Sequence, residues 1–234
     1  MASEDSVETL YRQRFRGLQK KRNGVWRVLC AYFARFISPG SSVLDVACGY
    51  GEFLNNLKEI RPDCKLLGAD INPDSQKCLR KGITFIHSSV ESVVLPDSSL
   101  DLVFASNFFE QLENSKVFLS VLKNITRMLK PNGCLMVLQP DLKLCGATYW
   151  DFLDHKFPVT VPRMIEATRL VGMCPEKIVR RFLPYTMSSR QPAHPFLVKL
   201  YIMLMPFSGW LFGKQFFALF RKTEVEAISS GEGE

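Results

Sequence analysis

The stretch VLDVACGYG, residues 43–51, decides the fold that this sequence predicts. An apolar run typical of a buried strand leads into glycines, and the segment Glu52–Ile60 after them has the apolar spacing of a helix. Glycines at such a turn let the backbone approach a ligand closely at the positive end of the helix dipole. A dinucleotide site would have its third glycine where Leu54 stands, and Asp45 puts an acid inside the strand end, so both features argue against NAD.

On either side of this stretch, predicted strands and helices alternate along the chain. The predicted strands are Val43–Ala47, Lys65–Ile71, Ile83–His87, Leu100–Ser106, Gly133–Gln139, Lys177–Leu183 and Lys214–Arg221. The helix-like segments are Glu52–Ile60, Pro73–Lys81, Ser115–Leu129 and Pro162–Val171. This alternation predicts a doubly wound α/β fold with a largely parallel, seven-stranded sheet. The last strand is expected to be antiparallel, because the chain leaves no room for a crossover helix before it.

The 234 residues fit one domain with terminal additions. We expect an N-terminal helical segment over 1–37, a main domain over 38–223 and a disordered tail over 224–234. The main domain divides into a first half, 42–139, which contains the glycine turn, and a second half, 140–223.

The formal charge of +7 is partly local, since residues 11–27 contain seven basic side chains and no acidic one. Such a stretch suits a phosphate, an anionic lipid or an acidic substrate. Apolar residues recur at near-helical spacing beside these charges, so we favour a solvated helix face as the interpretation.

The seven cysteines form no CxxC pair, their number is odd, and no secretory leader opens the sequence. A reduced, cytoplasmic compartment is therefore expected. The three histidines are scattered without zinc-site spacing, so we expect no metal. The most apolar segment, Phe196–Phe212, is interrupted by a lysine, a proline and a glycine, and falls short of the roughly 20 apolar residues that span a bilayer.

The glycine turn resembles motif I of the class I S-adenosylmethionine-dependent methyltransferases, which usually reads D-x-G-x-G-x-G. In that family the strand-end acid, here Asp45, helps to hold the amino group of the cofactor, and the glycines pass beneath its methionyl part. Asp70, at the tip of the second strand, resembles the acid that accepts hydrogen bonds from both ribose hydroxyls. Ser89 stands where the family usually has the acid that contacts adenine. Ala47 replaces the first motif glycine, which strains the backbone if its φ is positive.

The resemblance extends in order over residues 42–139. SNFFEQL, residues 106–112, is similar to the family's S-N-x-x-E-H-L, and RMLKPNG, residues 127–133, is similar to R-x-L-K-P-G-G. The resemblance implies that 42–139 is the cofactor half, which binds S-adenosylmethionine, and that 140–223 is the acceptor half. The implied cofactor-binding residues are Asp45, Ala47, Cys48, Gly49, Gly51, Asp70, Ile71, Ser89, Val90, Glu91, Ser106 and Asn107.

In the acceptor half, residues 149–155 read YWDFLDH and interleave acids and a histidine with large aromatic side chains, which suits a pocket wall. We predict that His155 is a general base, with a carboxylate that orients its ring. The candidate catalytic residues are His155, Asp154, Asp151 and Glu110. The alternative is a surface loop in which His155 is structural. With RFLPYT, residues 181–186, and GKQFF, residues 213–217, this stretch resembles a bacterial subgroup of the family associated with surface-polysaccharide gene clusters.

The predicted function is methyl transfer to a hydroxyl of a small molecule or of a sugar- or lipid-linked acceptor. Two alternatives stay open: an RNA methyltransferase, disfavoured because no RNA-binding module is visible, and an inactive cofactor-binding scaffold that acts through a protein partner. The segment 196–212 also has two interpretations. We favour a helix over 196–205 that is buried in the core. The alternative is an exposed apolar patch formed by the outer face of this helix and the loop 206–212, with Trp210 and the basic N-terminal stretch at its rim, which would suit peripheral contact with a membrane. The sequence predicts no oligomeric state.

Overall fold

The computed structural model describes residues 19–185 and 194–223, whose strands form one seven-stranded sheet in the order β3-β2-β1-β4-β5-β7-β6. The strands are β1 (Ser42–Val46), β2 (Lys65–Asp70), β3 (Thr84–His87), β4 (Leu100–Ser106), β5 (Leu129–Pro140), β6 (Met173–Leu183) and β7 (Gln215–Lys222). Neighbouring strands from β3 to β5 pair in parallel, whereas β7 pairs antiparallel with both β5 and β6. The predicted doubly wound, largely parallel sheet with an antiparallel last strand is confirmed.

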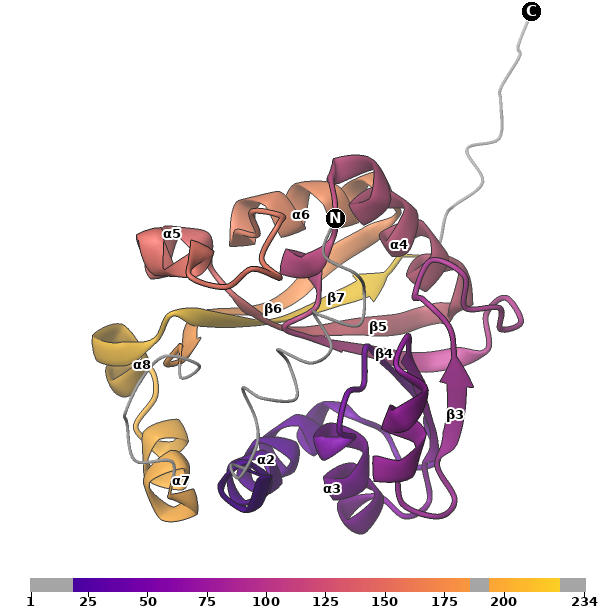
Figure 1. The fold of residues 1–234 in the computed structure, drawn as a ribbon, viewed down its shortest axis with the longest axis horizontal. Coiled ribbons are helices and arrows are strands. Elements are labelled where there is room, and N and C mark those ends of the chain that lie inside the picture. The colour runs from indigo at the N-terminus through magenta and orange to yellow at the C-terminus, as the bar shows by residue number, and fades with distance from the viewer. Residues whose placement is uncertain (1–18, 186–193, 224–234) are drawn as a thin grey trace, which may run out of the picture.

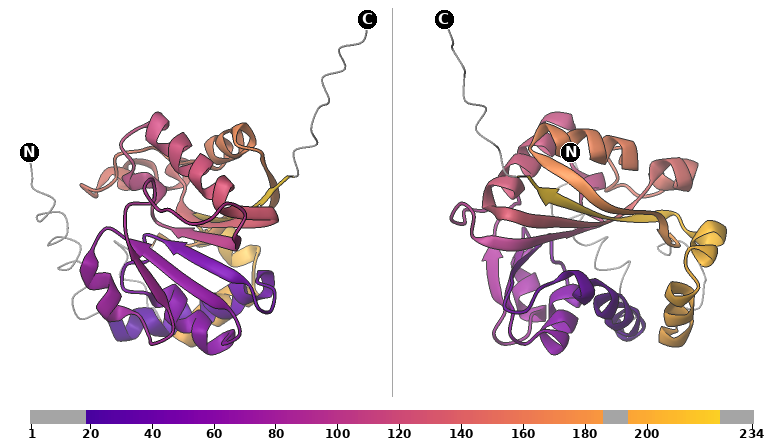
Figure 2. Two further views of the ribbon diagram at one scale, coloured as in Figure 1. Left: turned by 90° about the vertical axis from the view of Figure 1, so that its right-hand side faces the viewer. Right: turned by 180° about the vertical axis from the view of Figure 1, so that it is seen from behind.

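Helices cover both faces of this sheet (Figures 1 and 2). One face carries α4 (Ser115–Met128), α5 (Leu142–Cys145) and α6 (Val161–Leu170), and the other carries α2 (Gln19–Phe33) and α3 (Glu52–Ile60). Two further helices, α7 (Pro195–Met203) and α8 (Phe207–Phe212), lie beside α2 and β6 respectively. The short 3-10 turns are η1 (Ala34–Phe36), η2 (Pro73–Cys78), η3 (Phe109–Gln111) and η4 (Gly146–Trp150).

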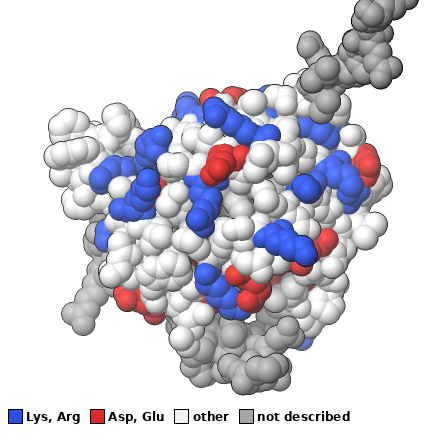
Figure 3. All heavy atoms as spheres, turned by 90° about the horizontal axis from the view of Figure 1, so that it is seen from above, with Lys and Arg blue, Asp and Glu red and all other residues white. Residues whose placement is uncertain are grey.

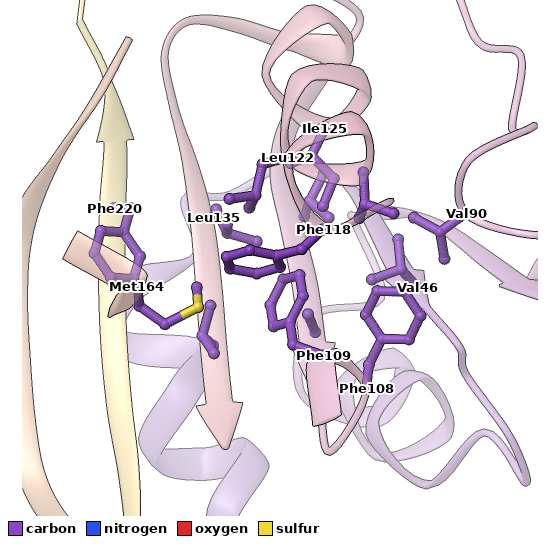
Figure 4. Close-up of a cluster of buried hydrophobic side chains, with 14 of the residues drawn as sticks. Val46, Val90, Phe108, Phe109, Phe118, Leu122, Ile125, Leu135, Met164 and Phe220 are labelled. Carbon is purple, nitrogen blue, oxygen red and sulfur yellow. The ribbon is translucent and has the colours of Figure 1, made fainter. Parts of the chain in front are cut away.

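Each face of the sheet has its own apolar core. On the α4 side, Phe109 and Phe118 point toward each other between the helix and the strands, with ring centroids 5.4 Å apart (Figure 4). On the α2 side, Phe33 stacks on Phe217 of β7 with ring centroids 5.2 Å apart, so α2 packs directly against β7. Burying one such side chain contributes about 2–3 kcal/mol, so the two cores hold the carboxyl ends of the strands in register.

Several predicted element bounds differ from the structure. The predicted helix Pro73–Lys81 is only the turn η2, because Ser75 is its one buried residue and a segment without an apolar face gains little by becoming a helix. The strand predicted at Lys177–Leu183 is β6 and begins at Met173, since β7 pairs with β6 from that residue onward. The expected N-terminal helix is present as α2, but residues 1–18 and the tail 224–234 lie outside the described residues.

The favoured interpretation of residues 196–205 as a buried helix is wrong, and most of the predicted loop 206–212 is helical. Segment 196–212 forms α7 and α8, which are separated at Pro206, a residue with no N–H to continue a helix. No residue of α7 is buried, and Trp210 of α8 is 70% exposed. Within the described ranges, no helix is long and apolar enough to cross a bilayer.

Candidate active site

The turn between β1 and α3 has the unusual backbone that its sequence suggested. Ala47, Gly49 and Gly51 all have positive φ values, of 56°, 51° and 71°. A Cβ on Gly51 would lie 2.5 Å from Leu79 Cδ2, so a side chain here would require Leu79 to move and would also be strained by the positive φ. Ala47 carries the strain that its sequence left conditional, because a left-handed L-residue costs roughly 1–2 kcal/mol.

Replacing Ala47 with glycine is therefore expected to stabilise the fold. Relief of the left-handed strain outweighs the larger unfolded-state entropy of glycine, for a net gain of about 0.5–1 kcal/mol in the free energy of unfolding. Urea denaturation measures this gain in the free energy of unfolding. The matched control is Ala69→Gly in β2, where the backbone is extended and the same change should destabilise the protein. A loss of stability in Ala47→Gly would contradict the strain.

Asp70 fixes the turn to the end of β2. Its Oδ2 accepts a hydrogen bond from the Gly49 N–H at 2.7 Å, and its Oδ1 accepts one from the Asn72 N–H at 2.8 Å. One carboxylate thus holds two loops together at the carboxyl edge of the sheet. Ile71, beside it, is 71% exposed, and the His87 Nε2–H donates to the Ile71 carbonyl at 2.9 Å.

Asp45 lies buried at the end of β1, behind the glycine turn. Desolvation raises the pKa of its carboxyl well above the ordinary range, and the nearby negative charges of Asp70 and Glu52 raise it further. These three carboxylates gather at one place, which suits a cationic ligand, because a positive charge there would favour the ionised form of Asp45.

The ends of β3 and β4 complete this edge. The Ser88 N–H donates to the Asp70 carbonyl at 3.1 Å, which brings Ser89 and its neighbours close to Asp70. Val90 is buried in the core, whereas Glu91 is exposed. Asn107 follows β4 with a φ of 48°, and its Nδ2 donates to Ser106 Oγ at 3.2 Å. With Cys48, which is buried in the turn, the structure places all predicted cofactor residues along one edge.

On the acceptor side, Glu110 and His155 meet inside the protein although they are far apart in sequence. His155 Nε2 lies 3.8 Å from Glu110 Oε1, and both side chains are at least 97% buried. The chain is held there by the Lys156 and Phe157 N–H groups, which donate to the Glu110 carbonyl at 2.7 and 2.9 Å. Desolvation raises the pKa of Glu110 to about 7, against the hydrogen bond from Gln139, which lowers it.

Aromatic side chains enclose His155. The ring centroids of Tyr149, Phe152 and Tyr185 lie 4.9, 5.2 and 6.3 Å from its own. The Tyr149 hydroxyl donates to the Phe157 carbonyl at 2.6 Å, so the aromatic loop is closed on itself and water is kept from the ring.

The other two candidate acids differ in how near they lie to this pair. Asp151 is exposed at the end of η4. Asp154 is half-buried, and its charge raises the pKa of Glu110, so it lies within electrostatic reach of the pair.

Two glutamines that the sequence did not single out lie at the same edge. Gln139 is fully buried and donates from Nε2 to Glu110, and Gln215 is buried with its Nε2 donating to the Pro184 carbonyl at 2.9 Å. The Oε1 atoms of both have no hydrogen-bond partner within the described residues. The signal was present: each glutamine stands at the strand end of an otherwise apolar run, LMVLQ and QFFALF.

Comparisons with known proteins find methyltransferases, both by sequence and by structure. Residues 44–137 match the family described as "Methyltransferase domain". The demethylmenaquinone methyltransferase of Chlorobaculum tepidum is 32% identical over 124 residues, which are 49% of this chain and 48% of the relative. The chain thus spans about half the length of the curated relatives it matches.

Solved structures share the fold at lower identity. A SAM-dependent methyltransferase from Archaeoglobus fulgidus is 22% identical with a TM-score of 0.63, covering 92% of this chain and 99% of that one. SpnF, which is named as a cyclase, is 16% identical with a TM-score of 0.60, covering 84% of this chain and 80% of its own. Residues 44–137 are therefore similar to a methyltransferase domain, and the chain shares the fold of solved S-adenosylmethionine-dependent methyltransferases.

Proposed function

We propose that the protein transfers the methyl group of S-adenosylmethionine to a hydroxyl oxygen of a small or lipid-linked acceptor. The observation that carries this proposal is the buried Glu110–His155 pair, which lies at the same sheet edge as the strained glycine turn. When bound, S-adenosylmethionine supplies a methyl group activated by a positively charged sulfur. The acceptor named for the relatives, demethylmenaquinone, is a small molecule, which supports an acceptor of that size class.

The residues at the turn fit this cofactor. Asp45 and Asp70 offer negative charge to a ligand that carries both an ammonium and a sulfonium group. Asp70 accepts backbone hydrogen bonds from Gly49 and Asn72, which hold its carboxylate at this edge. A carboxylate oxygen can accept more than one hydrogen bond, so the side chain is of the type that binds ribose hydroxyls. The exposed Ile71 offers an apolar surface to an adenine ring, and Ser89 with Val90 and Glu91 would line its edge.

The acceptor would lie between this turn and the buried pair. His155 takes the proton from the acceptor hydroxyl, and Glu110, 3.8 Å away, stabilises the imidazolium that results. Gln139 holds the Glu110 carboxylate in place. The unsatisfied Oε1 atoms of Gln139 and Gln215 are suited to accept hydrogen bonds from further hydroxyls of the acceptor. Positioning of the two reactants lowers the activation barrier by about 7–11 kcal/mol and supplies most of the rate enhancement, to which the base adds.

Asp70→Ala is expected to weaken binding of S-adenosylmethionine by about 10- to 100-fold, because a charge-assisted contact to the ribose is lost. Titration calorimetry with the cofactor and its demethylated product measures this. Asp70→Asn, which keeps an acceptor for the Gly49 N–H, should show an intermediate loss.

The matched control for that loss is Asp63→Ala. Asp63 also accepts a backbone N–H, from Gly40 at 2.5 Å, but it precedes β2 and lies at the opposite end of the strand. Equal affinity in Asp70→Ala and the wild type would remove Asp70 from the cofactor site.

The test of the function is turnover of methyl-labelled cofactor with cell extract, divided into lipid-extractable, water-soluble and nuclease-sensitive fractions. Alkali-stable label in a small or lipid-extractable product, recovered as a methyl ether, supports the proposal. Label that nuclease releases would favour the RNA alternative instead. Cofactor binding without any transfer would favour the inactive scaffold. The alanine with positive φ at position 47, where the motif has glycine, is consistent with that alternative.

A further inference from the structure

The outer surface of α7 and α8 is apolar and exposed among the described residues. Eight of its side chains are between 42% and 76% exposed: Phe196, Leu197, Met203, Leu204, Phe207, Trp210, Leu211 and Phe212. We refer to these residues as the α7–α8 surface. A surface helix normally presents polar residues to water, but between Pro195 and Phe212 the only charged residue is Lys199. An exposed apolar patch of this kind marks an interaction site.

The two helices already use their inner sides for packing. Val198, Tyr201 and Ile202 of α7 pack against the core that includes α2. In α8, a Cβ on Gly209 would lie 2.1 Å from the Arg181 carbonyl oxygen, so the helix rests directly on β6. The apolar outer side is therefore left over after the fold has satisfied its own core.

Basic residues lie on the two helices and in the segments next to them in the chain. From Lys177 to Thr223 the sequence has eight basic residues and no acidic one. Lys199, Arg181 and Lys214 are exposed on or beside the two helices, and within the described residues none of the three forms an ion pair with an acid. By contrast, the face over α4, α5 and α6 shows both signs interspersed (Figure 3).

We propose that the α7–α8 surface docks the protein onto an anionic lipid bilayer. Exposed phenyl and indole side chains insert into the interfacial region, while Lys199, Arg181 and Lys214 contact anionic headgroups. A second copy of the chain fits less well. A twofold contact would bring the same basic rim against itself, with no acidic residue to compensate.

The position of the surface gives the docking a consequence. Phe212 is three residues from Gln215, and the Lys214 carbonyl between them accepts from the Asp141 N–H at 3.0 Å, at the end of β5. The bilayer would therefore lie next to the edge that holds Gln139 and Gln215. If the proposed methyl transfer holds, the acceptor can reach the site from the membrane; the docking itself does not depend on that function.

The test is flotation of the full chain with phosphatidylcholine vesicles, with and without phosphatidylserine, at low and high salt. We expect binding to the anionic vesicles, and release by salt as the basic contacts are screened. The double variant Phe207→Ser with Trp210→Ser should weaken the partition by at least about tenfold. Its matched control is Val94→Ser with Leu170→Ser, two residues that are 87% and 69% exposed elsewhere.

The charge contribution is tested separately. Lys199→Gln with Lys214→Gln should weaken binding to anionic vesicles by about tenfold, whereas Lys116→Gln with Lys123→Gln, exposed on α4, should not. All variants change exposed side chains, so circular dichroism and thermal midpoints should match the wild type.

Three results would overturn the docking: no flotation of the wild type at low salt, flotation of the Phe207/Trp210 variant equal to the wild type, or a dimer in sedimentation velocity that this variant abolishes. The last result would assign the surface to a second copy of the chain.

Discussion

Replacing His155 with alanine is expected to lower kcat by at least about 100-fold, while affinity for S-adenosylmethionine stays within about twofold of the wild type. The imidazole lies among the aromatic side chains of its loop, beside Glu110, and not at the glycine turn. Its loss should therefore affect removal of the acceptor's proton rather than binding of the cofactor. Steady-state kinetics together with cofactor calorimetry separate the two quantities.

A pH profile distinguishes a base from a packing residue. In the wild type, kcat should rise with pH as Glu110, whose pKa burial raises to about 7, ionises and supports the base. His155→Ala removes the base that this carboxylate supports, so its residual rate should lack that dependence. The control is His194→Ala, an exposed histidine that accepts from the Phe196 N–H at the start of α7. Unaltered turnover in His155→Ala would make His155 a structural residue of the loop.

The fold followed from local patterns, because βαβ units repeat over short distances in the chain. The strands β1 and β4 could be predicted from apolar runs, four of the five residues of β1 being buried. What the pattern does not contain is which helix covers which surface. Segment 196–212 is apolar on nearly every side, and hydrophobicity alone favoured burial. Its inner side packs against the core, whereas its outer side is exposed among residues 19–185 and 194–223.

The cofactor edge was predictable for a physical reason. The carboxyl ends of neighbouring parallel strands meet at one edge, so an acid at the end of β2 must lie near the turn after β1, as the bond from Gly49 to Asp70 shows. The acceptor side differs. Glu110 meets His155 only because the backbone of residues 156–157 bonds to the Glu110 carbonyl, a contact with no sequence periodicity.

The missed glutamines illustrate the same limit of local reasoning. Gln139 and Gln215 come together because Pro140 pairs with Gln215 in the antiparallel register of β5 and β7. That register requires the insertion of the last strand between β5 and β6, which no neighbouring residue in the sequence specifies.

Glu110→Gln is expected to lower activity and to raise stability, and the gain in stability should depend on pH. Burial raises the folded-state pKa of Glu110 to about 7 from an ordinary 4.5, so the folded protein holds a proton that the unfolded chain releases. The stability that this proton contributes is complete below pH 4.5 and is lost as pH rises through about 7. Glutamine does not ionise, and it can still accept from Gln139.

The stability advantage of the variant over the wild type should therefore grow as pH rises from acidic to mildly alkaline. The increase in the difference between their free energies of unfolding should be of order 2–3 kcal/mol. Over the same range its kcat should be lower by about 100-fold or more, because no carboxylate remains to stabilise the charged His155. The control is Glu113→Gln, whose carboxylate is exposed and paired with Lys156, and which should change neither quantity with pH. Urea denaturation of both variants across pH measures the difference. A stability gain that stays constant with pH would mean that Glu110 does not titrate in this range, and the pairing of an ionisable Glu110 with the base would lose its support.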